Sequence, residues 1–217
     1  MSMVMGFDGN TGVVDCGGGG TLNLNAAFTI EVLFKKRTSS VSIMELVGRW
    51  VGAQGYILFI QTGGRVSMYI NGVAAYADHI VPVKDEWVRA SFTWIAGGNL
   101  RAYKNGVLAD TLAIFAACTD SGNNLLISGT YGSFPRFDGS IAQVTAYNRV
   151  LSVTELAYNY AHPNNPIKLG CVLNLTQESL FGGQWKDLSG SANHGTLSAT
   201  GVGPIQSNLI AGRNVSL

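Results

Sequence analysis

The chain has 217 residues, of which 47% are hydrophobic and 12% are charged, and its formal net charge is +1. Surfaces that bind nucleic acid need clustered Lys and Arg, and the sequence offers one short basic run, Lys35-Lys36-Arg37, so we expect no nucleic-acid partner. No apolar stretch approaches the roughly 20 residues that cross a bilayer, so we expect no membrane insertion.

The first residues and the cysteines indicate a reducing compartment. Residues 1–9 lack the basic start and the long apolar run of a signal peptide, so we expect the protein to be made in the cytoplasm without a secretion signal. The three cysteines are widely spaced and odd in number, which favours small, reduced core residues over zinc ligands. They are Cys16, Cys118 and Cys171.

The first half of the chain alternates apolar and polar residues with a period of two. Residues 28–34 alternate large apolar side chains with Thr29 and Glu31, which predicts a half-buried strand. Residues 56–60 and 65–70 predict two further strands, joined through Gly63-Gly64. Asn71-Gly72 predicts the next tight turn, because both residues accept a positive φ.

One sequence pattern occurs twice, with the second copy 34 positions after the first. Residues 63–75 read GGRVSMYINGVAA and residues 97–109 read GGNLRAYKNGVLA, with the glycine pair, Tyr, Asn-Gly and Val in register. A repeat of this length also occurs in helical arrays, but the helical periodicity is missing. We therefore expect two copies of the same β-hairpin inside an antiparallel sheet.

The last third of the chain contains one helix signal and a tail. Ser152 and Glu155 form the pattern of a capping box, Leu151, Leu156 and Tyr160 are expected to face the sheet, and Pro163 ends the run. We place a core domain at residues 1–165. The tail, residues 166–217, either completes the same sandwich or pairs with a neighbouring subunit.

These elements predict an all-β fold. Many short strands with one late helix favour a two-sheet antiparallel jelly-roll sandwich over a parallel α/β sheet. The expected fold has one short helix near residues 152–161 and a C-terminal extension that returns to the sheet.

Several phrases, in this order, resemble the concanavalin A-like lectin/glucanase superfamily, in its laminin-G-like and pentraxin-like branch. These are Phe7-Asp8-Gly9, residues 28–32, residues 87–88 with 100–106, and residues 137–144 with 147–155. Residues 185–197 resemble a segment that usually precedes the opening Phe-Asp-Gly. Its place here implies either a circular permutation or a tail that pairs with a neighbouring subunit. Permutation is the simpler explanation, because the termini of sandwiches often lie close together.

The sequence lacks the residues of a catalytic site. Glycosidases with the fold that the resemblance implies place carboxylates in an ExDxE pattern, and retaining hydrolysis needs two of them about 5 Å apart. The chain has no such triplet and no GxSxG elbow. We therefore expect a protein that is not an enzyme and has no cofactor.

Two kinds of binding residue remain. The resemblance implies a calcium ion held by loop carboxylates at Asp8, Asp15 and Asp138, although Ala142-Gln143 replaces an acidic pair of the family and weakens that expectation. The alternative role of Asp8 and Asp138 is to cap turns. Exposed aromatic rings beside Gly- or Ser-containing loops are candidates for stacking on a sugar. These are Trp50, Tyr56, Tyr131 and Phe134.

Two functions fit these features. The first is a structural or decorating subunit of a large assembly, most plausibly a phage or other virus particle, with protein subunits of the particle or a homo-oligomer as partners. The second is a carbohydrate-binding, lectin-like module, and a virion-borne module would combine particle contacts with adhesion to surface glycans. The low charge and the strand-bearing tail favour the first function, and the fold that the resemblance implies supports the second.

Overall fold

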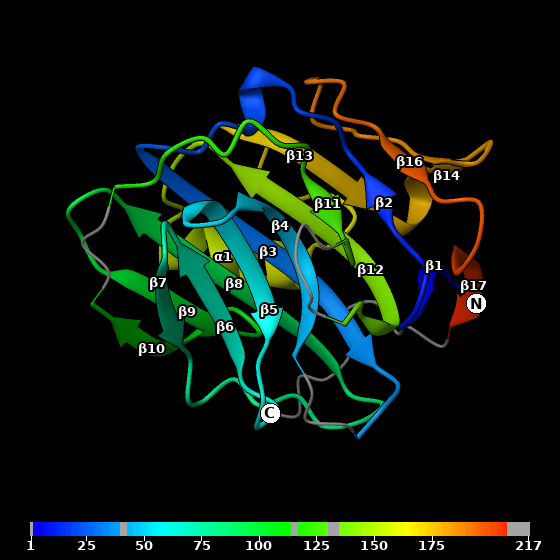
Figure 1. Cartoon of the computed structure of the whole chain (residues 1–217), viewed down its shortest axis with the longest axis horizontal. Coiled ribbons are helices and arrows are strands. Elements are labelled where there is room, and N and C mark those ends of the chain that lie inside the picture. Colours follow the sequence, from blue (N-terminus) through cyan, green and yellow to red (C-terminus); the bar gives the residue numbers. More distant parts are fainter. Residues whose placement is uncertain (1, 40–42, 114–116, 130–134, 208–217) are drawn as a thin grey trace.

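The protein is a two-layer β-sandwich with one α-helix (Figure 1). The structure, a computed structural model, describes residues 2–39, 43–113, 117–129 and 135–207. Sheet A contains β1 (Ser2–Asp8), β3 (Ala27–Lys36), β8 (Trp87–Ile95), β9 (Leu100–Lys104), β10 (Val107–Leu112), β12 (Asp138–Tyr147), β13 (Cys171–Thr176) and β17 (Val202–Ser207). Sheet B contains β2 (Val14–Asp15), β4 (Met44–Val51), β5 (Gln54–Ile60), β6 (Val66–Ile70), β7 (Val73–Tyr76), β11 (Leu126–Ile127), β14 (Leu180–Phe181), β15 (Gln184–Trp185) and β16 (Gly195–Leu197). The helices are η1 (Gly20–Leu22), α1 (Val153–Ala161) and η2 (Gln177–Ser179).

Strand order confirms the predicted sandwich. Sheet A runs β10-β9-β8-β3-β12-β1-β17, with β13 also paired to β12, and sheet B runs β14-β15-β16-β2-β11-β4-β5-β6-β7. The paired strands in both sheets are antiparallel. In Figure 1, β4 to β7 lie in front of β3, β8 and β9, so each sheet has one face toward the other sheet and one outer face.

The core lies between the two inner faces. Alternate residues of β3, beginning with Phe28 and ending with Phe34, are buried against alternate residues of β5, such as Tyr56 and Leu58. The ring centroids of Phe28 and Tyr56 are 5.6 Å apart, so aromatic packing joins the two sheets. Each such buried side chain contributes roughly 1.5–3 kcal/mol to folding.

The repeated phrase forms one hairpin in each sheet, whereas the sequence led us to expect both inside one sheet. Asn71 and Gly72 join β6 to β7 with φ of 45° and 85°, and Asn105 and Gly106 join β9 to β10 with φ of 54° and 80°. The Asn71 side chain accepts a hydrogen bond from Gly55 N at 3.0 Å, and the Asn105 side chain accepts one from Arg89 N at 2.9 Å. Each asparagine therefore ties its turn to the neighbouring strand, which explains the repeat.

Helix α1 begins at the predicted capping box and packs on the outer face of sheet A. The Ser152 hydroxyl accepts from Glu155 N at 3.3 Å, and the Glu155 carboxylate accepts from Ser152 N at 2.8 Å. Leu156 is buried as expected, but the expectation for Tyr160 was wrong, because its side chain is 39% exposed. Asn159 takes the buried position instead and donates to Glu31 at 2.6 Å, because this part of the sheet surface is polar.

The described part of the C-terminal tail pairs within the same sandwich. β13 pairs with β12 in sheet A, β16 pairs with β2 in sheet B, and β17 pairs with β1 over six residue pairs. Of the two arrangements that the sequence left open, these pairings correspond to the tail that completes its own sandwich.

The described residues hold no helix with the length and apolar character needed to cross a membrane. Cys16, Cys118 and Cys171 are free and buried, and burial raises the pKa of each thiol.

Candidate functional site

A row of side chains crosses the outer face of sheet B. The strand register places Glu45 opposite Phe59, Phe59 opposite Ser67, and Ser67 opposite Tyr76. A parallel bridge adds Arg136 beside Glu45 on the far side of β4. We call these five residues the outer row, and four inter-strand spacings give it a length of about 19 Å.

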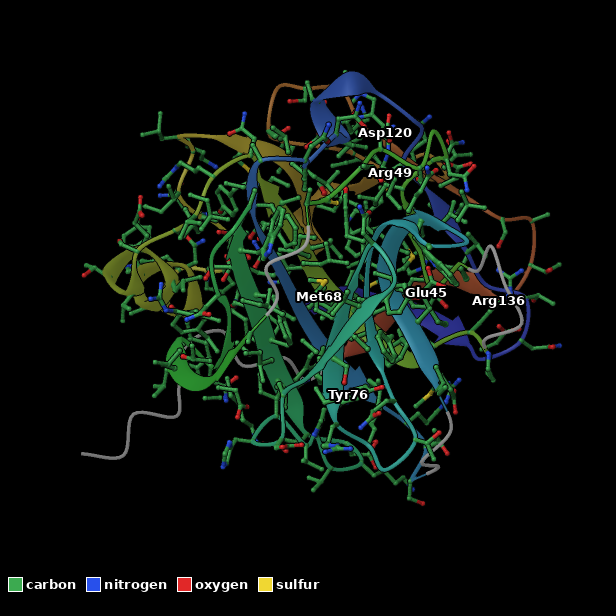
Figure 2. The ribbon with its side chains drawn as sticks, turned by 60° about the vertical axis from the view of Figure 1, so that its left-hand side comes forward. Glu45, Arg49, Met68, Tyr76, Asp120 and Arg136 are labelled. Carbon is green, nitrogen blue, oxygen red and sulfur yellow. The ribbon has the colours of Figure 1, made fainter. Side chains whose placement is uncertain are left out.

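The outer row is buried in the middle and accessible at its ends. Glu45 and Ser67 are 0% exposed and Phe59 is 7% exposed, whereas Tyr76 is 43% exposed and Arg136 is partly exposed. Figure 2 shows Glu45 and Arg136 close together, with Tyr76 farther along the sheet. A ligand on this face therefore meets an aromatic ring at one end and a guanidinium at the other.

An aromatic pair lies beside the outer row. The ring centroids of Trp50 and Tyr69 are 6.1 Å apart in an edge-to-face arrangement, and both side chains are partly exposed. Trp50 lies near the end of β4, opposite Gly55 of β5, and Asn123 Nδ2 donates to the Trp50 carbonyl at 3.0 Å. The pair is held by its neighbours while its rings stay partly open to solvent.

The Glu45 carboxyl lies near the Trp50 indole of this pair. Gly48 leaves room for it, because a Cβ at that position would lie 2.8 Å from Glu45 Oε1. Burial raises the pKa of Glu45 to about 8, against the smaller opposing effects of the Trp50 indole hydrogen bond and the Arg136 charge. At neutral pH the carboxyl is therefore mostly uncharged.

Arg136 and Ser67 have unused hydrogen-bonding capacity. Within the described ranges, Arg136 Nη1 and Ser67 Oγ are buried and have no hydrogen-bond partner. At the other end of the row, the Arg65 guanidinium lies 5.4 Å from the Tyr76 ring centroid and forms a salt bridge with Asp78. Arg65 therefore has a salt-bridge partner, whereas Arg136 has none in the described ranges.

The predicted aromatic residues do not form one group. Trp50 lies on the outer face of sheet B, as a sugar contact requires. The interpretation of Tyr56 does not fit its position, because it is 2% exposed in the core and its hydroxyl donates to the Leu22 carbonyl at 3.0 Å. Tyr131 and Phe134 lie outside the described residues.

The three predicted calcium ligands do not converge. Asp8 accepts hydrogen bonds from the backbone N–H groups of Asn10, Thr11 and Gly12, which hold the pKa of Asp8 well below its usual range. Asp138, its cross-strand partner, accepts a hydrogen bond from Arg37 Nε at 2.9 Å.

Asp15 lies in the other sheet and accepts from Gly17 N and Asn124 Nδ2. In the described part of the chain, no three acidic, His or Cys side chains gather as a metal site would need. The residues present therefore do not fit the calcium ion that the resemblance implied, and turn capping by Asp8 fits better.

A separate pocket of about 220 Å³ lies at the opposite edge of sheet B. The turn between β14 and β15 forms one wall, with Phe181 65% exposed at its rim. The lining is mainly apolar and includes Met3, Leu197 and Pro204. It contains no charged side chain, so the pocket offers less for recognising a polar ligand than the outer row does.

Sequence reasoning missed Glu45, Tyr69, Tyr76 and Arg136. Glu45 and Arg136 are 91 positions apart in the sequence and meet through an isolated bridge. A usable signal did exist: Glu45 is a single acid inside the otherwise apolar run Met44–Val47, which is unusual for a buried strand.

Comparison with known proteins places the chain in a family. Residues 8–157 match the model of the Laminin_G_3 family, described as "Concanavalin A-like lectin/glucanases superfamily". No curated protein gave a significant match.

Three solved structures share the fold. A candidate carbohydrate-binding protein from Bacteroides ovatus superposes with a TM-score of 0.74 at 17% identity, and the match covers 96% of this chain and 60% of that one. The heptameric SAP-like pentraxin of Limulus polyphemus has a TM-score of 0.58 at 12% identity, covering 73% of this chain and 82% of the pentraxin. Domain 4 of the arabinanase AbnA from Geobacillus stearothermophilus, solved in complex with arabinotriose, has a TM-score of 0.56 at 13% identity, covering 71% and 75%.

Identities this low establish a common fold and nothing further. This chain spans about three fifths of the Bacteroides protein, so the activity of that whole protein is not carried over.

Proposed function

Because this chain belongs to the Laminin_G_3 family of the concanavalin A-like lectin/glucanases superfamily, we propose that it binds carbohydrate through the outer face of sheet B. The observation that carries the proposal is the partly exposed Trp50–Tyr69 pair beside the outer row. Aromatic rings present an apolar face to a pyranose, and adjacent polar groups can bond its hydroxyls.

The surroundings of the pair supply those polar groups. Arg136 Nη1 and Ser67 Oγ have no hydrogen-bond partner among the described residues, and an unpaired buried polar atom costs roughly 1–3 kcal/mol. Sugar hydroxyls both donate and accept, so a glycan would recover part of that cost if the side chains around these two buried atoms moved aside. Among similar structures, one protein is named as a candidate carbohydrate binder and another domain was solved with arabinotriose, which supports the same reading.

The acidic residues favour binding over hydrolysis. Retaining glycoside hydrolysis uses two carboxyl groups about 5 Å apart. The groups that act on the Glu45 carboxyl in the described residues are Trp50 and Arg136, and neither is an acid. A single buried carboxyl beside an aromatic pair fits a binding face.

The comparisons favour this carbohydrate-binding reading over the virus-particle reading that the sequence suggested first. A role in a virion, contacts with other subunits, and synthesis in the cytoplasm stay predictions. Their test is the size of the purified protein in solution, because a particle subunit is expected to assemble.

The proposal is tested by a glycan array followed by calorimetry on the best ligand. Replacing Trp50 by Ala removes the stacking surface, so we expect at least about a tenfold loss of affinity with the fold retained. Circular dichroism of the variant checks the fold.

Phe181→Ala is the matched control. Phe181 is more exposed than Trp50 and lies on the separate pocket, so its replacement should leave glycan affinity unchanged. Failure of the wild-type chain to bind any glycan, or equal affinities of the Trp50→Ala variant and the wild type, would contradict the proposal.

A further inference from the structure

The charge on the outer face of sheet B is not balanced. In the described ranges, Arg136 takes part in no salt bridge, and its Nη1 atom is buried without a hydrogen-bond partner. Its neighbour in the outer row, Glu45, is buried and held mostly uncharged at neutral pH. The nearest acid along the chain, Asp138, is bonded to Arg37.

Among the described residues, two other arginines of sheet B and its turns are paired. Arg65 bonds Asp78 at the Tyr76 end of the row, and Arg49 bonds Asp120 at 3.0 Å beyond Trp50. Phe59, which lies opposite Glu45, and Ser67, which lies opposite Phe59, carry no charge. One positive charge, that of Arg136 beside Glu45, therefore remains without a salt-bridge partner in the described ranges.

We propose that the outer face of sheet B prefers glycans that carry a carboxylate, with Arg136 as the group that pairs with it. The inference rests on the proposed function and names its ligand class. A planar guanidinium matches a carboxylate through two parallel hydrogen bonds, which a neutral sugar cannot provide.

Glu45 makes the preference depend on pH. While its carboxyl is protonated, Arg136 can attract the carboxylate of a ligand. When Glu45 ionises, a negative charge appears next to Arg136, compensates it, and repels the ligand. Because the pKa of Glu45 lies at about 8, the preference for acidic glycans should fall as the pH rises through that value.

The experiment compares matched glycan pairs on the full chain. One pair is a glucuronic-acid-terminated oligosaccharide and its glucose-terminated counterpart, and the other is sialyllactose and lactose, so the two arms separate uronic from sialic acids. Dissociation constants are measured by calorimetry at pH 6.5 and pH 9.5. We expect at least one acidic member to bind about tenfold more tightly than its neutral partner at the lower pH, and less than about threefold more tightly at the higher pH.

Two variants locate the effect. Arg136→Gln should abolish the preference, because it lowers affinity for the acidic member about tenfold more than affinity for the neutral partner. Glu45→Gln, which keeps the shape and stays uncharged, should retain the preference at both pH values. Arg101→Gln removes an exposed arginine of β9 in sheet A and is the matched control, with the preference unchanged.

The outcomes separate this inference from the proposed function. Binding of acidic and neutral partners with equal affinity at pH 6.5, or a preference that survives in Arg136→Gln, overturns the inference alone. A pH dependence that persists in Glu45→Gln removes the role of Glu45. If neither member of either pair nor any array glycan binds, the proposed function fails as well.

Discussion

Each outer face of the sandwich buries one glutamate, and the two are held differently. Glu31 on sheet A and Glu45 on sheet B are both 0% exposed. Glu31 accepts from Ser91 Oγ at 2.8 Å and from Asn159 Nδ2 at 2.6 Å, with Arg89 3.9 Å away. Glu45 has the Trp50 indole and the charge of Arg136 nearby, and burial outweighs both in setting its pKa.

The comparison shows what a covering helix does. On sheet A, α1 supplies Asn159 and completes a network in which the carboxylate is structural. On sheet B, the acid is left with few donors beside a partly exposed aromatic pair. Burial alone therefore does not identify a functional acid, and the number of donors around it distinguishes the two cases.

Two large effects are expected, and the first comes from breaking the sheet A network. Glu31→Gln removes the negative charge and leaves Arg89, 1% exposed, without its counter-charge. Because an unpaired buried charge is costly, the free energy of unfolding should fall by roughly 4 kcal/mol. Urea denaturation measures it, and a loss below about 1 kcal/mol would show that Arg89 does not depend on Glu31.

The second effect is the pH dependence that Glu45 imposes on stability. Its pKa is raised from 4.5 to about 8 in the folded chain, so between these values the folded state holds a proton that the unfolded state has released. Stability should therefore decline by roughly 4–5 kcal/mol as the pH rises through this window, and level off above about 8.

Glu45→Gln isolates this contribution. The variant should match the wild type near pH 4.5 and exceed it at pH 9, with unfolding curves recorded at both values and at pH 7. Parallel curves for the two proteins across the whole range would mean that Glu45 titrates normally.

The smallest expected change in the free energy of unfolding comes from Gly48→Ala, which tests whether the Glu45 side chain lies over Gly48. Gly48→Ala places a methyl group 2.8 Å from Glu45 Oε1 and 3.0 Å from Ile57 Cγ1, and such crowding costs about 1–2 kcal/mol of unfolding free energy. In a Glu45→Ala background the same substitution should cost less, because one of the two contacts is gone. An identical cost in both backgrounds would place the Glu45 side chain elsewhere.

The fold could be predicted from the sequence because its signals are local. The Asn-Gly turns, the Ser152 capping box and the alternation of residues 28–34 each depend on a few adjacent residues. The site depends on which face a side chain occupies. Residues 56–60 are apolar at every position, so no alternation distinguishes Tyr56, which faces the core, from Ile57, which faces outward.

In sheet A, the first strand of the chain, β1, pairs with the last described strand, β17. This pairing affects how the protein folds during its synthesis. β1 pairs with β17, about 200 residues later, at a synthesis rate of roughly 5–20 residues per second. One edge of β1, with Met3, Val4 and Met5, therefore lacks its hydrogen-bonding partner for roughly 10–40 seconds, until β17 is translated. During that interval the nascent chain offers an unpaired apolar strand to other chains, so a chaperone that shields the first ten residues should raise the yield of folded protein.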